Sequence, residues 1–233
     1  MSTSIEIIPV APRGCRRPGD VLADLITANV ALRDGDVLVV TQKVVSKAEG
    51  RLVEIDPDDI EARRALVERE SVRVLRRRGD LIISETAHGF VCANAGVDLS
   101  NVEAGQAALL PIDSDRSARR IRDGVRARAG VEVGVIVSDT FGRAWRRGLT
   151  DVAIGCAGVA AIVDLRGTAD ALGRVMQVTE VAVADELAAA AELVMGKASG
   201  VPAAVVRGVD PTWLRESSVR AEVVRPAAED LFR

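Results

Sequence analysis

Apolar and polar positions follow two patterns in the first third of the chain. The run Asp36–Thr41 (DVLVVT) is almost unbroken and rich in β-branched residues, which predicts a buried strand. Residues 21–32 before it space their apolar side chains as an amphipathic helix does, after a Pro-Gly-Asp turn. Asp56 and Pro57 then form a helix start signal, and we expect one long helix from there to Gly79.

The middle of the chain departs from a strict alternation of strands and helices. Consecutive strands favour an α+β fold with mixed sheets over a doubly wound parallel sheet. No Pro/Ser-rich linker or internal repeat divides the sequence, so we expect a single domain over residues 1–233, either undivided or built from two intertwined subdomains. The further elements expected are strands at 80–84, 88–94, 107–111, 131–138, 151–158, 160–167 and 202–208, and helices at 114–130 and 183–197.

Composition narrows the class of protein. Hydrophobic residues make up 48% but aromatic residues only 2%, so the core must be aliphatic. The net charge of −3 argues against a general nucleic-acid partner. No segment reaches the roughly 20 apolar residues of a membrane span, and the N-terminus lacks signal-peptide features. Cys15, Cys92 and Cys156 lie far apart without a CxxC pair, so neither a disulfide frame nor a zinc site is suggested and a cytoplasmic protein is expected.

A carboxylate and a hydroxyl follow one of the apolar runs directly. Asp139 and Thr140 come after VIVS, at the expected end of a strand, and Asp98 lies in the loop AGVDLSN after another strand. Such oxygens suit Mg²⁺ or Mn²⁺, which also keep waters that phosphates can replace. The alternative for each aspartate alone is a turn or cap residue.

Basic residues beside these positions point to phosphate or carboxylate. Arg143, Arg146 and Arg147 follow Asp139 closely, and guanidinium forks bind such anions bidentately. Trp145 between them could stack on a ring, although packing is the favoured role. Lys47 is placed as a phosphate-binding ammonium, with a surface salt bridge as its alternative.

No known phosphate-loop signature accompanies these residues. Neither GxxxxGK[ST] nor GxGxxG occurs in the sequence. Taken by themselves, the residues indicate a metal-dependent enzyme acting on nucleotides or phosphoryl groups through an unfamiliar architecture.

Several long motifs resemble one family. The segments IEIIPV, VVTQKVVSKAEGRLV, CANAGVDLSNV, VSDTFGRAWRRGLTDVAIG, VTEVAVADELAAAAELVMGK and DLFR closely resemble the coenzyme F420-0:L-glutamate ligases, and the similarity covers essentially the whole chain. The resemblance implies the family's α+β fold of interlocked subdomains, a homodimer, and GTP-dependent amide formation between L-glutamate and coenzyme F420-0 through an acyl phosphate. It also implies later γ-linked glutamates and a need for Mg²⁺ or Mn²⁺, with K⁺ as a further candidate.

The resemblance assigns roles to particular positions, although no catalytic residue is assigned. It makes Asp98, Asp139 and Thr140 the metal ligands, and Lys197 lies where relatives place a ligand for a second ion. Two departures, the loop sequence RGCR and Gln42 in place of a frequent Ser, bear on nucleotide preference. The nucleotide-binding positions implied are Arg13, Gly14, Cys15, Arg16, Gln42, Lys47 and Asn101, and the phosphate- or substrate-binding candidates are Arg143, Arg146 and Lys197.

Other functions remain open at this point. The chain could be a nucleotide-binding regulatory module without turnover, or a metal-dependent phosphohydrolase. In many relatives a nitroreductase-like, flavin-binding domain follows this unit. The sequence, which ends in DLFR, carries no such segment, so we expect no flavin chemistry from it.

Overall fold

The computed structural model describes residues 4–11 and 18–230 and centres on a mixed sheet of five strands. The strand order is β1-β12-β2-β8-β9, in which β2 and β8 are parallel and the other neighbours antiparallel. These strands are β1 (Glu6–Val10), β12 (Ala203–Arg207), β2 (Val37–Thr41), β8 (Gly134–Arg143) and β9 (Arg146–Ala157).

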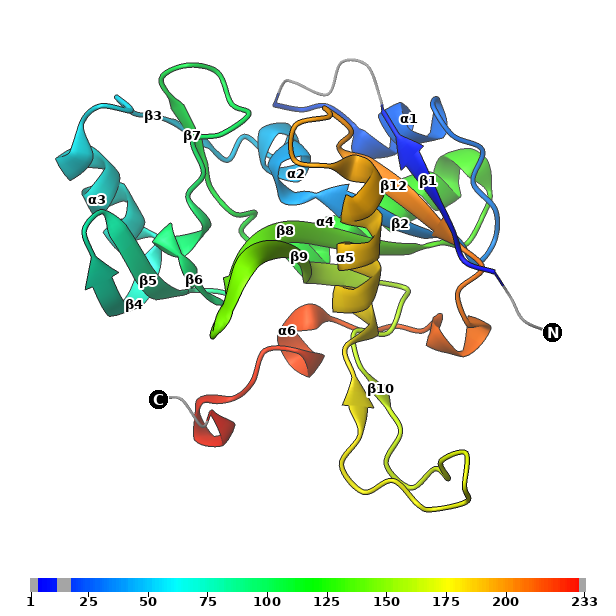
Figure 1. Cartoon of the computed structure of the whole chain (residues 1–233). Helices are drawn as coiled ribbons and strands as arrows, with labels where there is room; N and C mark the ends of the chain where they lie inside the picture. Colours follow the sequence, from blue (N-terminus) through cyan, green and yellow to red (C-terminus); the bar gives the residue numbers. More distant parts are fainter. Residues whose placement is uncertain (1–3, 12–17, 231–233) are drawn as a thin grey trace.

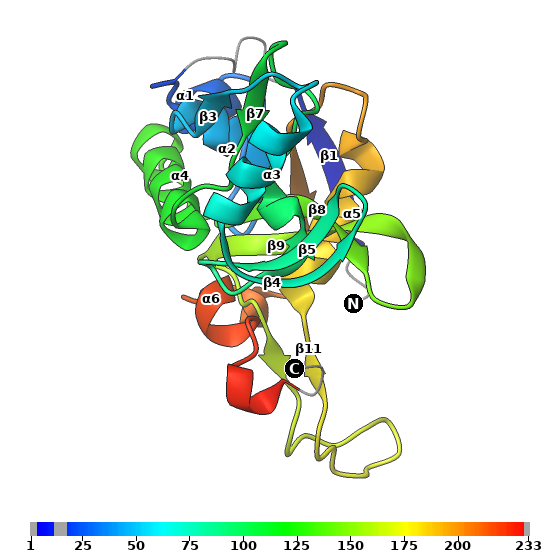
Figure 2. The ribbon, with the colours of Figure 1, turned by 90° about the vertical axis from the view of Figure 1, so that its left-hand side faces the viewer.

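Helices cover both faces of this sheet (Figures 1 and 2). Leu38 and Val40 of β2 pack toward α1 (Leu22–Thr27) and α4 (Ser114–Ala129). Val37 and Val39 point the other way, toward α5 (Val183–Met195). Because both faces of β2 and β12 are buried, these two strands are continuous apolar runs rather than alternating ones.

A smaller lobe lies beside the main sheet (Figure 1). Its apolar contacts are made by Leu66 and Val67 of α3 with Ile82, Ala95, Ala107 and Leu109. Phe90, just before β6, makes an edge contact with Phe141 of β8 at 6.1 Å between ring centroids, which joins the lobe to the main sheet. The lobe contains α3 (Ile60–Arg69), β4 (Ser71–Arg78), β5 (Leu81–Thr86), β6 (Val91–Ala93), β3 (Leu52–Glu54) and β7 (Gln106–Ala108).

The prediction of one long helix up to Gly79 is wrong. The helix α3 ends at Arg69, and Ser71–Arg78 forms β4, which pairs antiparallel with β5. Val72 and Val74 alternate with polar residues in SVRV, and β-branched residues favour a strand when a partner strand is available. The pairing with β5 therefore decides the conformation of a segment whose arginines also suit a helix.

Other boundaries follow the sequence pattern more closely. The helix expected at 114–130 is confirmed as α4, whose Asp113 cap accepts from the Arg116 N–H and whose last turn is closed by Gly130 at φ 68°. The strands expected at 36–41 and 202–208 are confirmed as β2 and β12. The first helix is shorter than expected, because α1 ends at Thr27.

The strand expected at 160–167 is reduced to a short pair. Only Val163–Asp164 (β10) is extended, and it pairs with Glu180–Val181 (β11) at the base of a projecting arm. The remaining elements are α2 (Gln42–Ala48), α6 (Val219–Glu222) and 3-10 turns at Asn94–Gly96, Pro211–Trp213 and Ala227–Glu229.

Within residues 4–11 and 18–230, no helix has both the length and the hydropathy that crossing a membrane would require.

Candidate active site

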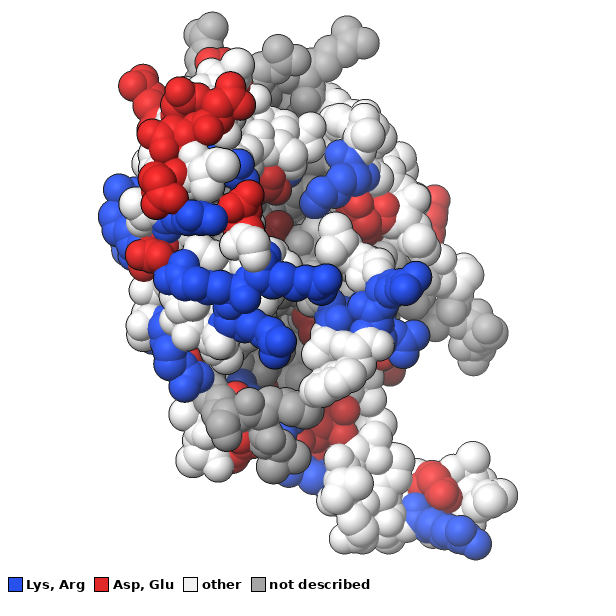
Figure 3. Space-filling view, turned by 60° about the vertical axis from the view of Figure 1, so that its left-hand side comes forward, with Lys and Arg blue, Asp and Glu red and all other residues white. Residues whose placement is uncertain are grey.

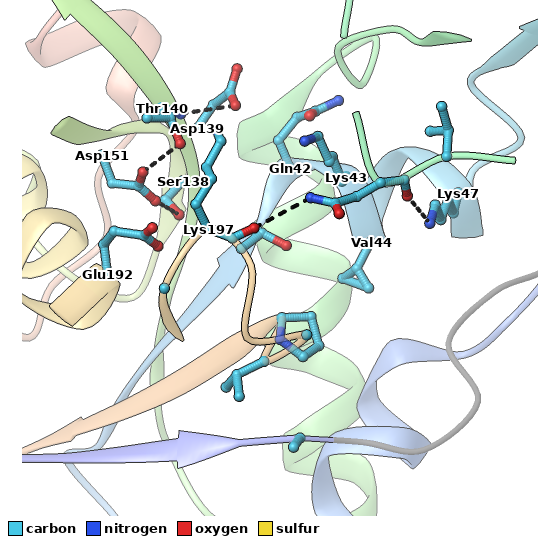
Figure 4. A pocket seen from close by; sticks show the side chains of 18 of the residues that line it. Gln42, Lys43, Val44, Lys47, Ser138, Asp139, Thr140, Asp151, Glu192 and Lys197 are labelled. Carbon is cyan, nitrogen blue, oxygen red and sulfur yellow. Dashed lines mark hydrogen bonds between the residues drawn. The ribbon is translucent and has the colours of Figure 1, made fainter. Parts of the chain in front are cut away.

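A cavity of about 860 Å³ opens at one end of the main sheet (Figure 4). Seven parts of the chain contribute to it: the residue after β1, the β2–α2 junction, the start of β3, the loop before β7 with the first residue of β7, the middle of β8, the middle of β9, and the end of α5 with the loop that follows it. The polar residues that line it are Thr41, Gln42, Lys43, Lys47, Asn101, Glu103, Gln106, Ser138, Asp139, Thr140, Asp151, Glu192 and Lys197.

The parallel pair β2 and β8 explains why these residues meet. Thr41, the last residue of β2, is in register with Ser138 of β8. The chain after Thr41 turns into α2, whereas β8 continues through Asp139 and Thr140. The residues that follow Thr41 and those that follow Ser138 therefore lie side by side at one end of the β2–β8 pair.

The expectation that Asp139 and Thr140 follow the end of a strand is wrong. They lie inside β8, because β9 continues to pair with it: Asp139 is opposite Val152 and Thr140 is opposite Asp151. Because the hairpin extends this far, β9 places the Asp151 carboxylate opposite Thr140, where it can accept a hydrogen bond.

Asp151 is a site residue that the sequence reasoning missed. Its carboxylate is only 3% exposed and accepts two hydrogen bonds, from Ser138 Oγ at 2.9 Å and from Thr140 Oγ1 at 2.7 Å. Because the Thr140 hydroxyl uses its hydrogen in the bond to Asp151, the lone pairs of Thr140 Oγ1 are left for another partner. The register between β8 and β9 sets this arrangement, and no local motif announces it.

Asp139 is a half-buried carboxylate with no salt-bridge partner among the described residues. The pKa of Asp139 is raised from 3.8 to about 7, chiefly by burial and also by the nearby charges of Asp98 and Asp151. The Thr140 N–H, at 2.9 Å, and the charge of Lys197 act in the opposite direction. The site therefore holds an acidic group that a cation would stabilise.

Asp98, unlike Asp139, already has a cation. Lys43 Nζ lies 2.8 Å from Asp98 Oδ2 and 2.6 Å from Ser100 Oγ. Burial by itself would raise the pKa of Asp98, but the hydrogen bonds from Lys43 and from the Ser100 N–H, together with the Lys43 charge, hold it below its ordinary value. Lys43 is a second residue that the sequence reasoning did not assign.

Three of the expected binding residues contact one another. Lys47 Nζ donates to the Asn101 carbonyl at 2.7 Å, and Asn101 Nδ2 donates to the Lys197 carbonyl at 3.4 Å. Asn101 has a φ of 56°, a left-handed conformation that Asn tolerates better than most residues. The α2 helix, the loop before β7 and the loop after α5 are thus tied together around the cavity.

Gln42 is almost entirely buried, with 1% exposure. Its Nε2 donates to Ser46 Oγ at 2.7 Å and to the Leu109 carbonyl at 2.9 Å, while its Oε1 has no partner within the described chain. The Gln42 side chain therefore holds α2 against the lobe, and its Oε1 can still accept a hydrogen bond. The expected nucleotide contacts Arg13, Gly14, Cys15 and Arg16 lie outside the described residues.

The expected substrate-binding arginines do not line the cavity. Arg143 and Arg146 lie at the tip of the β8–β9 hairpin, whereas Lys197 does line it. The side chain of Trp145, at the same tip, is 82% exposed and lies outside the buried core.

A divalent metal fits this site if substrate completes its coordination. The described residues contain no group of three or more His, Cys, Asp or Glu side chains placed to hold a metal ion. Asp98, Asp139 and the Thr140 hydroxyl supply a few hard oxygen donors, and Mg²⁺ commonly takes one or two carboxylates plus phosphates and water. That donor set excludes a closed structural site and suits an ion brought in with a nucleotide.

Comparisons with known proteins identify the family of this chain. A family model described as F420-0:Gamma-glutamyl ligase matches residues 15–208. The chain is similar to the coenzyme F420:L-glutamate ligases of Methanopyrus kandleri (43% identical over 99% of this chain and 98% of the relative) and Methanothermobacter thermautotrophicus (46%, over 92% and 93%). It is also similar to that of Archaeoglobus fulgidus (43%, over 98% and 96%). The chain therefore belongs to the F420-0:gamma-glutamyl ligase family, and its α+β architecture with mixed sheets agrees with that membership.

Proposed function

We propose that this protein forms an amide bond between L-glutamate and coenzyme F420-0, and that GTP drives the reaction. The observation that carries the proposal is the cavity itself. It places the uncompensated carboxylate of Asp139 in the same space as Lys43, Lys47 and Lys197. Relatives that share 43% or more identity over more than nine-tenths of this chain are named as ligases of coenzyme F420 and L-glutamate.

Amide formation in water needs an activated carboxyl group. In the proposed course the acceptor carboxylate attacks the γ-phosphorus of GTP, which forms an acyl phosphate and releases GDP. The glutamate amine then attacks the acyl carbon, phosphate leaves and the amine nitrogen loses a proton. Further glutamates would be joined through the γ-carboxyl group of the previous one.

The residues of the cavity have distinct parts in this scheme. The ammonium groups of Lys47 and Lys197 offset phosphate charge, and Asn101 holds the loops that carry them. A divalent ion held by Asp98, Asp139 and Thr140 would supply further neutralisation of phosphate charge. Asp151 fixes the direction of the Thr140 hydroxyl.

We assign to Glu192 the role of accepting the proton that the amine loses. It lines the cavity from α5, and burial, with the charge of Asp151 as a further cause, raises its pKa above the ordinary value. A carboxylate of raised pKa is a better general base near neutral pH. The homodimer, the use of K⁺ and the cytoplasmic location stay predictions of the sequence.

The test is a reconstitution with each component omitted in turn. The protein is incubated with GTP, L-glutamate, coenzyme F420-0 and Mg²⁺ or Mn²⁺, and the deazaflavin product and GDP are measured by mass spectrometry and chromatography. We expect glutamylated product and GDP in equal amounts, each dependent on both co-substrates. GTP binding without turnover would indicate a regulatory module, and phosphate release without glutamate would indicate a phosphohydrolase.

A further inference from the structure

Two segments far apart in the sequence carry many of the arginines on one face of the molecule. The strand β4 (SVRVLRRR) and the hairpin tip between Thr140 and Thr150 (FGRAWRRGL) each contain arginines and no acidic residue. Figures 1 and 2 both place the hairpin beside the small sheet of β4, β5 and β6. Figure 3 shows a band of Lys and Arg side chains across this face, beside a hollow.

Many of these guanidinium groups are not neutralised. Arg77 pairs with Glu68 at 2.6 Å and Arg73 with Glu85 at 3.3 Å. In the part of the chain that the structure describes, the side chains of Arg76, Arg78, Arg146 and Arg147 make no hydrogen bond or ion pair, and Arg143 donates only to the Arg147 carbonyl. We define these five residues, Arg76, Arg78, Arg143, Arg146 and Arg147, as the arginine surface.

The part of the arginine surface on β8 is close enough to the cavity for one small-molecule ligand to reach both. Arg143 follows Asp139 by four residues on β8, which corresponds to about 13 Å at roughly 3.3 Å per strand residue. The Phe90–Phe141 contact joins the lobe to β8 between these two positions. A ligand with one end at Asp139 can therefore extend along the hairpin.

The chemistry of the surface indicates an anion that also has a flat apolar part. Guanidinium forks match phosphodiester and carboxylate oxygens bidentately. The exposed side chains of Trp145 and Leu149 on the same hairpin, 82% and 64% exposed, add apolar area against which a ring system can lie. The cavity meanwhile has its own cations, Lys47 and Lys197, for a triphosphate.

We propose that the arginine surface docks the anionic acceptor of the ligase reaction, holding its phosphodiester and ring while its carboxylate reaches into the cavity. This proposal rests on the proposed function, from which it takes the acceptor. Polyanions such as RNA are disfavoured because the whole chain has a net charge of −3 and because Figure 3 shows an acidic region beside the band.

Direct binding tests the proposal without requiring turnover. The dissociation constant of coenzyme F420-0 is measured by the fluorescence of its deazaflavin ring for the wild type and for two double variants, Arg76→Ala/Arg78→Ala and Arg146→Ala/Arg147→Ala. We expect each pair to weaken acceptor binding about three- to tenfold and to leave GTP binding unchanged. The same deazaflavin without its phosphodiester should bind all three proteins alike.

Two further variants serve as controls. Arg119→Ala changes an exposed arginine on α4, which lies on the far side of the sheet from the hairpin in Figure 2, and should leave acceptor binding as in the wild type. Arg146→Lys/Arg147→Lys keeps the charge and should recover part of the affinity. Thermal unfolding of every variant shows whether the fold is retained.

The outcomes separate this inference from the proposed function. A wild type that glutamylates the acceptor, with both double variants binding it normally, would overturn the arginine surface alone. Double variants that bind the acceptor normally but lose GTP binding, or lose binding to a short RNA, would also overturn it. The surface would then bind a different anion. A wild type that binds the acceptor through these arginines but yields no glutamylated product would overturn the ligase reaction alone.

Discussion

The Thr140 hydroxyl donates a 2.7 Å hydrogen bond to Asp151 Oδ1, across the register of the β8–β9 hairpin. The other oxygen of the same carboxylate accepts from Ser138 Oγ. An acceptor-only group that is almost fully buried thus sets the orientation of a hydroxyl that faces the cavity.

Replacing Asp151 tests this relationship. In Asp151→Asn one carboxylate oxygen is replaced by an NH₂ group, which donates. The hydroxyl that donated to that oxygen, of Ser138 or Thr140, must then rotate so that it accepts a hydrogen bond instead. We expect turnover to fall at least about tenfold and the free energy of unfolding to drop by about 1–3 kcal/mol. Steady-state kinetics and urea unfolding measure the two effects. Ser138→Ala, which leaves the Thr140 bond intact, should retain most of the activity, and an equal loss in both variants would argue against a special role for Thr140.

Asp139 should make stability depend on pH. Burial raises its pKa from 3.8 to about 7, so between these values the folded protein holds a proton that the unfolded chain has lost. Its contribution to stability is therefore greatest below about pH 4 and is lost as the pH rises toward 7. Asp139→Asn, which stays neutral, should be more stable than the wild type at pH 8 by on the order of 1 kcal/mol or more, and equal at pH 4. Denaturant unfolding at both pH values tests this, and a gap that widens toward low pH would contradict it.

The same carboxyl should make metal binding depend on pH. Below pH 7 it must release a proton before it can bind a cation, so Mg²⁺ should raise the melting temperature more at pH 8 than at pH 6. Asp139→Asn should lose this response and at least about tenfold in turnover, because a hard ion loses an anionic ligand. Near-normal activity of the variant at limiting Mg²⁺ would refute the metal assignment.

Lys47 should matter for the nucleotide more than for the fold. Its Nζ donates to the Asn101 carbonyl, and both residues line the cavity, so Lys47→Ala removes a charge and a loop contact together. We expect the KM for GTP to rise about tenfold or more, with the KM for glutamate little changed. Lys47→Arg keeps the charge but not the compact ammonium and should recover only part of the loss. A Lys47→Ala protein with an unaltered KM for GTP would place the triphosphate elsewhere.

Asp115 offers a test of the fold that is independent of function. Its buried carboxylate accepts from the backbone N–H groups of Cys156, Val219 and Arg220, and so ties α4 to β9 and α6. Asp115→Ala leaves these donors unpaired and should cost about 2–5 kcal/mol of unfolding free energy. Asp123→Ala, on the exposed side of the same helix, should change stability by less than about 0.5 kcal/mol. Chemical denaturation of both variants gives the comparison.

Local sequence patterns were sufficient to predict an element where they favoured a single secondary structure. The apolar run of β2 predicted a strand buried on both faces, and the Asp113 cap with Gly130 bounded α4. They were insufficient for β4, where the choice between helix and strand depends on pairing with β5. Short-range preferences amount to a few tenths of a kcal/mol per residue, which tertiary pairing readily outweighs.

The sequence by itself determined the α+β class, the family membership and the identities of Asp98, Asp139 and Lys47 as candidates, because those depend on residue types and motifs. Only the tertiary structure decided that Lys43 neutralises Asp98 while Asp139 lacks a salt-bridge partner within the described chain, and that Asp151 orients Thr140. Those properties depend on strand register and on distances between segments separated by tens of residues, which local sequence patterns do not encode.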